Sequence, residues 1–445
     1  MISQPGFQVP RICLPRPGID LRKWAVVACD QHTSEPAYWA IVDREVGDEP
    51  SSLHLIFPEV LLGTAQAQAR IDDIRQTMKR YLADGLLYER EGAIYIERTI
   101  GDRIRRGVML ELDLEHYDFS RDSTSLIRPT EDTIVARLAP RIEVRSGAEL
   151  ELPHILVLID DPAGTVIEPI GAVRGALTKL YDTELMLGGG RVAGYGVGSA
   201  EVERAIQSLH ALANPAAFAA RYGVPAETPV MLFAVGDGNH SLATAKSIWD
   251  RVKGSVGMSH PSRFALVEVV NIHDPALEFS PIHRLMFDVT VDVRTELVNA
   301  FGGGLLCTDV PSASVMRERV QAADSSRQVA GLIGPGARFS VIEFTDPPLP
   351  LVVGTLQAFL DRLIERGGAT DIDYVHGDEA LERLSMGDGI VGFHLPTLGK
   401  GQLLQMVVRE GPLPRKTFSM GEAHEKRYYV EARRIRQPDD TPLSR

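Results

Sequence analysis

The chain lacks several features by which the class of a protein can be recognised. It has three cysteines, Cys13, Cys29 and Cys307, in an odd number and at wide spacing. This excludes a disulfide framework and a zinc-binding pattern, and it suits a reducing compartment. No run of about 18 apolar residues is present, so we expect no membrane-spanning helix. The first residues lack the basic start and apolar core of a signal peptide, and we therefore expect a cytoplasmic protein.

Basic charge is also scarce. The 445 residues include 60 Asp and Glu but 47 Lys and Arg, which gives a formal net charge of −13. A general nucleic-acid-binding protein shows a basic face, so we expect a small-molecule substrate instead of a nucleic acid. The contents of hydrophobic residues (44%) and charged residues (24%) are typical of a globular protein. A chain of this length predicts more than one compact region, while the oligomeric state cannot be read from it.

The common catalytic and nucleotide-binding motifs are missing as well. The sequence contains no G-x-S-x-G and no H-E-x-x-H pattern. Its one conspicuous strand–glycine–helix segment, GDGNHS, is not a P-loop, because no Lys-Ser or Lys-Thr pair follows at the required spacing. It is not a dinucleotide fingerprint either, because Ser241 stands where the third glycine would be.

That segment, residues 229–250, is nevertheless the most informative part of the chain. Residues 230–235 form an apolar run of strand length, and apolar residues recur at helical spacing over 239–251. Gly236 and Gly238 indicate a tight turn between them, with Asn239 or Ser241 as the expected N-cap. Helix starts attract anions, and glycines allow a ligand to approach the backbone. We therefore expect an anion site, whose polar side chains are Asp237, Asn239, His240 and Ser241.

Helical and strand patterns alternate along the chain without a regular β-α-β rhythm. This predicts an α+β (mixed α/β) fold with irregular mixed sheets and flanking helices. We expect an N-terminal α+β region (1–165), a central region with the GDGNHS segment (166–411) and a basic C-terminal arm (412–445). The pattern also predicts a strand over 24–29. The glycine-rich stretch 188–199 is expected to be a flexible connector, with a second anion loop or a mobile lid as alternatives.

A few polar residues outside the loop are further candidates. Arg128 and Glu131 are expected on a loop, as site residues or as a buried pair. Arg284 follows His283 in a stretch that could clamp a phosphate or cap an element. Asp30 comes directly after a predicted strand end, where sites often occur. His154 begins a predicted strand, and we expect a structural role for it.

Several segments together resemble one protein family. GDGNHSLATAK, WAVVACDQHTSEPAYW, IRPTEDTIVARLAPR, FSPIHRL and LPRKTFSMGEA resemble, in matching order along the chain, the bacterial and archaeal family known as domain of unknown function 1015. Many members have a GHHR-like loop, whereas this chain has Asn239 and Ser241 on either side of His240. The loop is also similar to one in the ParB/sulfiredoxin-like fold, which includes partition proteins, sulfiredoxin and free-serine kinases. This resemblance implies that the predicted α+β fold has a ParB/sulfiredoxin-like core.

The second resemblance implies a function. In that fold the loop holds nucleotide phosphates, which implies ATP or ADP with Mg²⁺ as ligands here. The chain would then be a kinase or phosphotransferase acting on a small hydroxyl compound such as a serine-like amino acid. Asp237 would hold Mg²⁺, His240 would contact the transferred group and Glu131 would be the general base. Arg128 and Arg284 would neutralise charge. A phosphatase with the same substrate class and a ParB-like nucleotide-binding regulatory protein are the alternatives.

Overall fold

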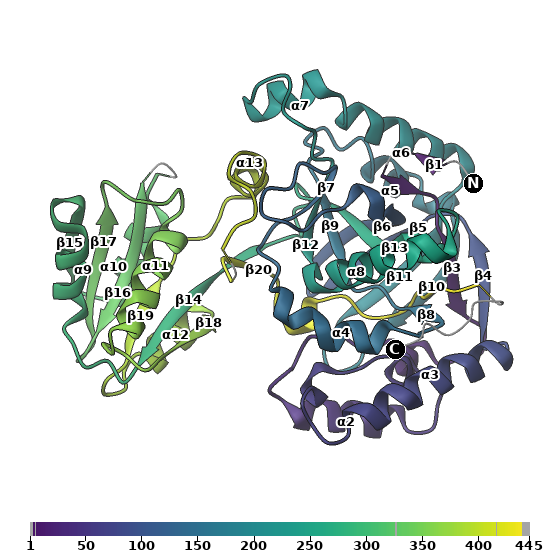
Figure 1. The fold of residues 1–445 in the computed structure, drawn as a ribbon, viewed down its shortest axis with the longest axis horizontal. Helices are drawn as coiled ribbons and strands as arrows, with labels where there is room; N and C mark the ends of the chain where they lie inside the picture. Colours follow the sequence, from purple (N-terminus) through teal and green to yellow (C-terminus); the bar gives the residue numbers. More distant parts are fainter. Residues whose placement is uncertain (1–2, 5, 325–326, 415, 438–445) are drawn as a thin grey trace. The chain divides into compact units, whose positions relative to one another are not determined.

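The computed structural model describes residues 3–4, 6–324, 327–414 and 416–437, and the chain forms two compact units (Figure 1). Unit 1 comprises Met1–Glu278, Leu404–Pro412 and Gly421–Arg445, and unit 2 comprises Phe279–Leu403 and Leu413–Met420. These units do not coincide with the three predicted regions 1–165, 166–411 and 412–445. The predicted C-terminal arm, of which residues 415 and 438–445 lie outside the described residues, is divided between both units.

Unit 1 is built on a ten-stranded mixed sheet. Eight strands follow the order β10-β11-β5-β6-β13-β9-β12-β7, and β2 joins the sheet beside β6 and pairs with β1. The bounds of these strands are β1 (Ser3–Gln4), β2 (Phe7–Gln8), β5 (Ile94–Ile100), β6 (Arg103–Asp113), β7 (Ile127–Pro129), β9 (Leu156–Ile159), β10 (Thr178–Glu184), β11 (Arg191–Gly196), β12 (Phe233–Asp237) and β13 (Phe264–Asn271). Two further pairs lie outside it: β3 (Arg11–Pro15) with β4 (Leu87–Glu91), and β8 (Leu150–Glu151) with β21 (Arg433–Arg434).

The strand directions bring several chain segments to one sheet edge. β12 and β7 are parallel, so their carboxyl ends meet, while β9 runs antiparallel to β12 and begins at the same edge. The residues just after β7, just after β12 and just before β9 therefore become neighbours. The helices of unit 1 are α1 (Leu21–Trp24), α2 (Pro36–Val46), α3 (Ala67–Ala83), α4 (Leu138–Arg145), α5 (Glu168–Ala172), α6 (Ser199–Leu212), α7 (Pro215–Tyr222) and α8 (Asn239–Val256).

The unit 1 sheet buries both of its faces. Successive residues of β5 point to different cores: Ile94 and Ile96 to one, Tyr95 to the other. The first core also contains apolar side chains of α2, α3 and the C-terminal segment, and the second contains those of α6 and α8. This explains why β9 and the first three residues of β12 are apolar and show no polar alternation.

The C-terminal segment of unit 1 is part of the interior. Tyr428, Tyr429 and Val430 are at most 3% exposed. Arg427, 4% exposed, forms ion pairs with Glu268 and Glu431. Because these charges are paired inside the unit, the basic residues of this segment are not a solvated arm.

Unit 2 contains a seven-stranded sheet with helices on both faces (Figure 1). Its main strand order is β15-β17-β16-β19-β14-β18, with β20 paired to β14, and all its strand pairs are antiparallel. The strands are β14 (Phe279–Phe287), β15 (Leu305–Val310), β16 (Gln328–Gly334), β17 (Arg338–Phe344), β18 (Asp371–His376), β19 (Val391–His394) and β20 (Phe418–Met420). The helices are α9 (Val293–Phe301), α10 (Ala313–Gln321), α11 (Val352–Glu365) and α12 (Asp378–Leu384), while α13 (Lys400–Glu410) includes residues of both units.

The predicted fold class, α+β with mixed sheets, is confirmed, and two local predictions are wrong. Trp24 does not begin a strand but ends α1, because Asp20 caps that helix by accepting hydrogen bonds from Arg22 and Lys23. The glycine-rich stretch 188–199 is neither a connector nor a loop over half of its length, because β11 lies within it. A Cβ atom at Gly194 would lie 2.1 Å from the ring of Tyr181, so close packing explains this glycine.

No helix in the described part of the chain is both long and apolar enough to cross a bilayer.

Candidate functional site

The predicted glycine turn lies at the carboxyl end of β12, where the chain passes directly into α8. Gly236 and Asp237 end β12, Gly238 has a left-handed backbone (φ +78°), and Asn239 is the first residue of α8. A Cβ atom at position 238 would lie 3.0 Å from the Cα atom of Ile155. Conformation and space therefore both require glycine at this position. The predicted order of strand, glycine turn and helix is confirmed, but the strand covers 233–237 and not 230–235, so Gly238 alone lies between the two elements.

The start of α8 has no side-chain cap. Asn239 or Ser241 was predicted as the N-cap, but the N-cap is Gly238, which has no side chain to accept a hydrogen bond. The first N–H groups of an α-helix have no partner within the helix. In this 18-residue helix they also lie at the positive end of the helix dipole. The backbone here is suited to binding an anion.

Asp237 makes two contacts at the helix start. Its Oδ1 accepts a hydrogen bond from the Gly238 N–H at 2.9 Å, and its Oδ2 lies 3.1 Å from Nζ of Lys426. Lys426 is 9% exposed and comes from the C-terminal segment. Sequence reasoning missed Lys426, because only the strand order of unit 1 shows that this segment returns to the loop.

His240 is neutral at pH 7. Burial, followed by the positive charges of Arg141 and Arg137, lowers its pKa to about 4. Its Nε2 accepts a hydrogen bond from the backbone N–H of Ile134 at 3.3 Å. Because one nitrogen of a neutral imidazole accepts and the other carries the hydrogen, Nδ1 of His240 is a hydrogen-bond donor. The arginines that act on His240 are thus Arg137 and Arg141, and not Arg128 and Arg284, to which the sequence analysis assigned the neutralisation of charge.

Ser241 belongs to a second group of polar side chains. Its Oγ lies 2.8 Å from Nε2 of His154, and Nδ1 of His154 lies 2.8 Å from the hydroxyl of Tyr429. Asp30 faces the same imidazole, with Oδ2 3.8 Å from Nε2. Burial raises the pKa of Asp30, but the charge of His154, the hydrogen bond from Gln31 and the charge of Lys426 outweigh it, so that this pKa is lowered.

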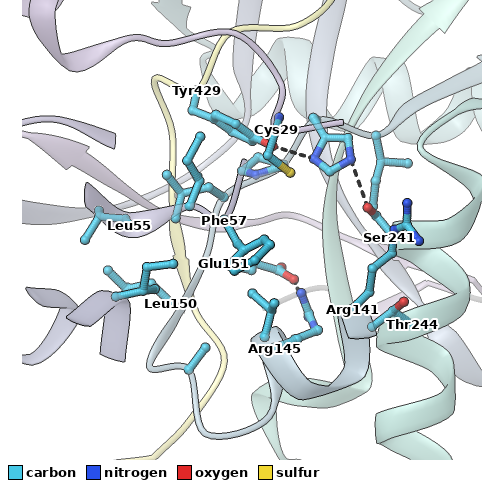
Figure 2. A pocket seen from close by; sticks show the side chains of 18 of the residues that line it. Cys29, Leu55, Phe57, Arg141, Arg145, Leu150, Glu151, Ser241, Thr244 and Tyr429 are labelled. Carbon is cyan, nitrogen blue, oxygen red and sulfur yellow. Dashed lines mark hydrogen bonds and ion pairs between the residues drawn. The ribbon is translucent and has the colours of Figure 1, made fainter. Parts of the chain in front are cut away.

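A cavity of about 140 Å³ lies beside this group (Figure 2). Ser241 and Thr244 of α8 line it on one side, and Leu55 and Leu150 lie across from them in Figure 2. His154, which we expected to be purely structural, also lines it. The cavity is therefore a largely apolar space inside unit 1 that reaches the first turn of α8.

Arg128 does not reach the loop. Its Nε donates to the carbonyl of Ser125 at 2.8 Å and its guanidinium donates to that of Pro229 at 2.6 Å. Both carbonyls lie shortly before the first residues of the parallel strands β7 and β12, whereas Asp237 is the last residue of β12. Arg128 also lies within β7 and not on a loop, and these contacts explain it as a structural residue.

Glu131 follows β7 at the edge where the loop lies. It is half-buried and comes after Thr130, whose hydroxyl donates to the carbonyl of Val235 at 2.7 Å. This bond ties the end of β7 to the end of β12.

Arg284 belongs to the interior of unit 2. It has no exposed surface, and its guanidinium donates to Oε1 of Gln357 at 2.7 Å and to the carbonyl of Ile282 at 2.6 Å. It also lies over the ring of Tyr374, 4.7 Å from the ring centroid. A guanidinium buried in this way would have to leave these partners before it could bind a phosphate, so a structural role explains it better than the predicted clamp.

One group of side chains among the described residues has its ligand atoms close enough to hold a metal ion: His283, Asp378 and His394, all within 4.8 Å. Asp237, the predicted Mg²⁺ ligand, is not part of it. Nδ1 of His283 accepts a hydrogen bond from the Leu395 N–H at 3.1 Å, so Nε2 carries the hydrogen and donates it to Asp378 at 3.0 Å. Metal-bound histidines donate their second N–H group to an acceptor, which is the opposite arrangement. The residues of this cluster do not fit a metal centre.

A family model described as "Protein of unknown function (DUF1015)" matches residues 13–363, and the chain belongs to this family. The comparison with curated proteins finds no match. A solved free serine kinase in complex with AMP is 12% identical, with a TM-score of 0.38, covering 74% of this chain and 91% of that chain. A conserved hypothetical protein from Pyrococcus furiosus is 12% identical, with a TM-score of 0.36 and coverage of 74% and 96%. C-terminally truncated SbnI from Staphylococcus aureus is 9% identical, with a TM-score of 0.34 and coverage of 74% and 92%.

Proposed function

We propose that this protein is an enzyme that binds a phosphate-bearing ligand, ATP or ADP, at the start of α8 and transfers a phosphoryl group to a small hydroxyl compound. The observation that carries the proposal is the uncapped helix start, with Lys426 and the neutral His240 beside it. Phosphoryl transfer requires mainly positioning and neutralisation of charge, and these residues provide both. The free cysteines fit the reducing cytoplasm.

The parts of the site suit different roles. The uncapped helix start would bind a phosphate through the backbone N–H groups of Asn239 and His240. Nδ1 of His240 would donate a hydrogen bond to the transferred group. Lys426, in place of the predicted Arg128 and Arg284, would supply positive charge. Asp237 already accepts from Gly238 and pairs with Lys426, so a Mg²⁺ ion would have to displace the lysine to bind this carboxylate.

Two carboxylates are candidates for the general base. Glu131 was predicted from the sequence and follows β7, at the sheet edge where the start of α8 lies. Asp30 faces His154 and has a lowered pKa, so it is ionised at pH 7 and can accept a proton. In phosphoryl transfer the base has to orient the hydroxyl group more than to deprotonate it early, and a carboxylate with a low pKa suffices.

The test is binding followed by turnover. Thermal shift is measured with ATP and ADP, with and without Mg²⁺, and then with small hydroxyl compounds, while ³¹P NMR follows the products. A ligand at a hundred times its Kd adds about 2.7 kcal/mol to the free energy of unfolding. We expect a shift with nucleotide and a new phosphate ester. Asp30→Asn and Glu131→Gln then identify the base by the larger loss of kcat.

Other outcomes support the alternatives. Release of inorganic phosphate from a phosphate ester without nucleotide would indicate a phosphatase. Nucleotide binding without turnover of any hydroxyl compound would indicate a nucleotide-binding regulatory protein. Failure of both nucleotides to shift the melting temperature would contradict the proposed function.

A further inference from the structure

The cavity beside Ser241 has mostly apolar walls built from separate parts of unit 1. Leu55, Ile74 and Met78 come from the N-terminal region and α3, and Leu150 and Leu266 come from strands; all are at most 3% exposed. Protein interiors are close-packed, with few voids larger than a water molecule. A space of about 140 Å³ among such side chains is comparable to the engineered apolar cavity of about 150 Å³ that binds benzene.

One end of the cavity is polar. His154, Ser241 and Tyr429 all line it, and they form a chain of hydrogen bonds of 2.8 Å from Ser241 Oγ through the imidazole to the Tyr429 hydroxyl. The Cys29 N–H donates to the same hydroxyl at 3.1 Å. A serine hydroxyl both donates and accepts hydrogen bonds, so it can exchange its bond to His154 for one with a ligand hydroxyl.

The charged groups of the cavity wall already have partners. Arg141 lies 2.5 Å from Glu59, and Arg145 lies 2.5 Å from Glu151. A free amino acid brings an ammonium and a carboxylate group, and burying either without a partner is costly. The wall therefore favours an uncharged body and does not suit the serine-like amino acid that the sequence suggested.

We propose that this cavity binds the uncharged, apolar body of a small alcohol, about six carbon atoms in size, with its hydroxyl group at Ser241 Oγ and His154 Nε2. Ser241 is the third residue of α8, within one helical turn of the proposed phosphate site. The ligand would thus be the hydroxyl substrate, and this identification, unlike the binding itself, rests on the proposed function.

The experiment titrates the full chain, without nucleotide, with cyclohexanol and with L-serine by isothermal titration calorimetry. We expect cyclohexanol to bind at least about tenfold more tightly than L-serine, a difference of about 1.4 kcal/mol. Ala148→Leu fills the cavity, since Ala148 lines it, and should abolish cyclohexanol binding while ATP binding stays unchanged. Ala216→Leu, at an exposed position of α7, is the matched control and should change neither. Ser241→Ala should weaken cyclohexanol binding about tenfold by removing one hydrogen bond.

Equal binding of both ligands, or unchanged cyclohexanol binding in Ala148→Leu, would overturn the proposal. If Ala148→Leu does not fold, intermolecular NOEs decide: contacts from cyclohexanol to the methyl groups of Leu55 and Leu150 support it, and their absence in the wild-type protein refutes it. ATP is titrated separately. Cyclohexanol binding without ATP binding would support the alcohol-binding cavity and contradict the proposed phosphoryl transfer. ATP binding without cyclohexanol binding would refute the alcohol-binding cavity and leave the proposed function standing.

Discussion

Two histidine clusters, one in each unit, differ in what surrounds them. In unit 1, His154 connects Ser241 to Tyr429 beside a cavity and the uncapped start of α8. In unit 2, His283 and His394 both donate to Asp378, their rings are stacked 4.6 Å apart, and the Leu395 N–H occupies the remaining nitrogen of His283. The unit 1 cluster therefore lies beside a cavity and beside the backbone N–H groups at the start of α8. In the unit 2 cluster, both ring nitrogens of His283 are hydrogen-bonded within the protein.

The comparison shows that residue type alone does not identify a site. Both clusters contain histidine next to a carboxylate, and Asp378 pairs with two imidazoles. What distinguishes the unit 1 cluster is its surroundings: the first N–H groups of α8, which have no side-chain cap, and a cavity that Ser241 lines both lie beside it. We therefore expect substitutions in the first cluster to change function and those in the second to change stability.

The largest effect on function is expected for His240→Ala. Removal of one donor that stabilises a transition state costs about 2.7–4 kcal/mol, a loss in kcat of about 10²–10³. The free energy of unfolding should change little, because His240 is only half-buried at the helix start. Steady-state kinetics and thermal denaturation on the same variant measure both. A variant that melts early but binds nucleotide normally once folded would refute the role in transfer.

The largest effect on stability is expected for His283→Ala. It removes an imidazole with no exposed surface and leaves the Leu395 N–H without its acceptor, at a cost of about 3 kcal/mol. Hydrogen exchange in β14 and β19 measures this loss in unit 2. His376→Ala, at an exposed histidine on β18, is the control and should cost less than His283→Ala, because less imidazole surface is buried there. Loss of ATP binding while unit 2 stays folded would contradict the distinction between the clusters.

A smaller effect is expected for Lys426→Ala. Hydrogen bonds to charged groups contribute about 1.5–3 kcal/mol, so ATP should bind about ten- to a hundredfold more weakly. Lys253→Ala removes a lysine on α8 that pairs with Glu115 and Asp250, and is the matched control. Calorimetric titration with ATP compares the two. Equal affinity in both variants would show that Lys426 serves only as a partner of Asp237.

The last effect concerns pH, and it is small near neutrality. Burial and the nearby arginines hold the pKa of His240 at about 4, below the unfolded value of about 6.5. Between pH 6.5 and 4 the His240 side chain is therefore protonated in the unfolded chain and neutral in the folded protein. The free energy of unfolding thus falls as the pH drops from 6.5 to 4, and the contribution of His240 stays constant below pH 4. Burial also lowers the pKa of His283, which acts in the same direction. NMR titration of the His240 ring should give a midpoint near 4; a midpoint near 6.5 would contradict its burial beside the arginines.

The loop could be predicted from the sequence because its information is local. The change from an apolar run to helical spacing across Gly236 and Gly238 predicts β12 and α8, and both are present. The N-cap was wrong because Asn239 already has helical geometry, so the cap position falls on Gly238.

The partners of the loop could not be predicted, because they depend on long-range strand order. Lys426 and Tyr429 reach α8 only because the C-terminal segment packs inside unit 1. Arg128 and Arg284 were assigned to the site by charge alone, and their backbone carbonyl partners carry no sequence signal.

The most direct test of the central claim is a titration of the ¹⁵N-labelled protein with ADP, followed through its backbone amide resonances. If the start of α8 binds phosphate, the amides of Asn239, His240 and Ser241 should shift with a common Kd, while those around His283 should not move. Amide shifts that leave these three residues unchanged, at ADP concentrations where calorimetry shows binding, would contradict the assignment of this helix start as the phosphate site.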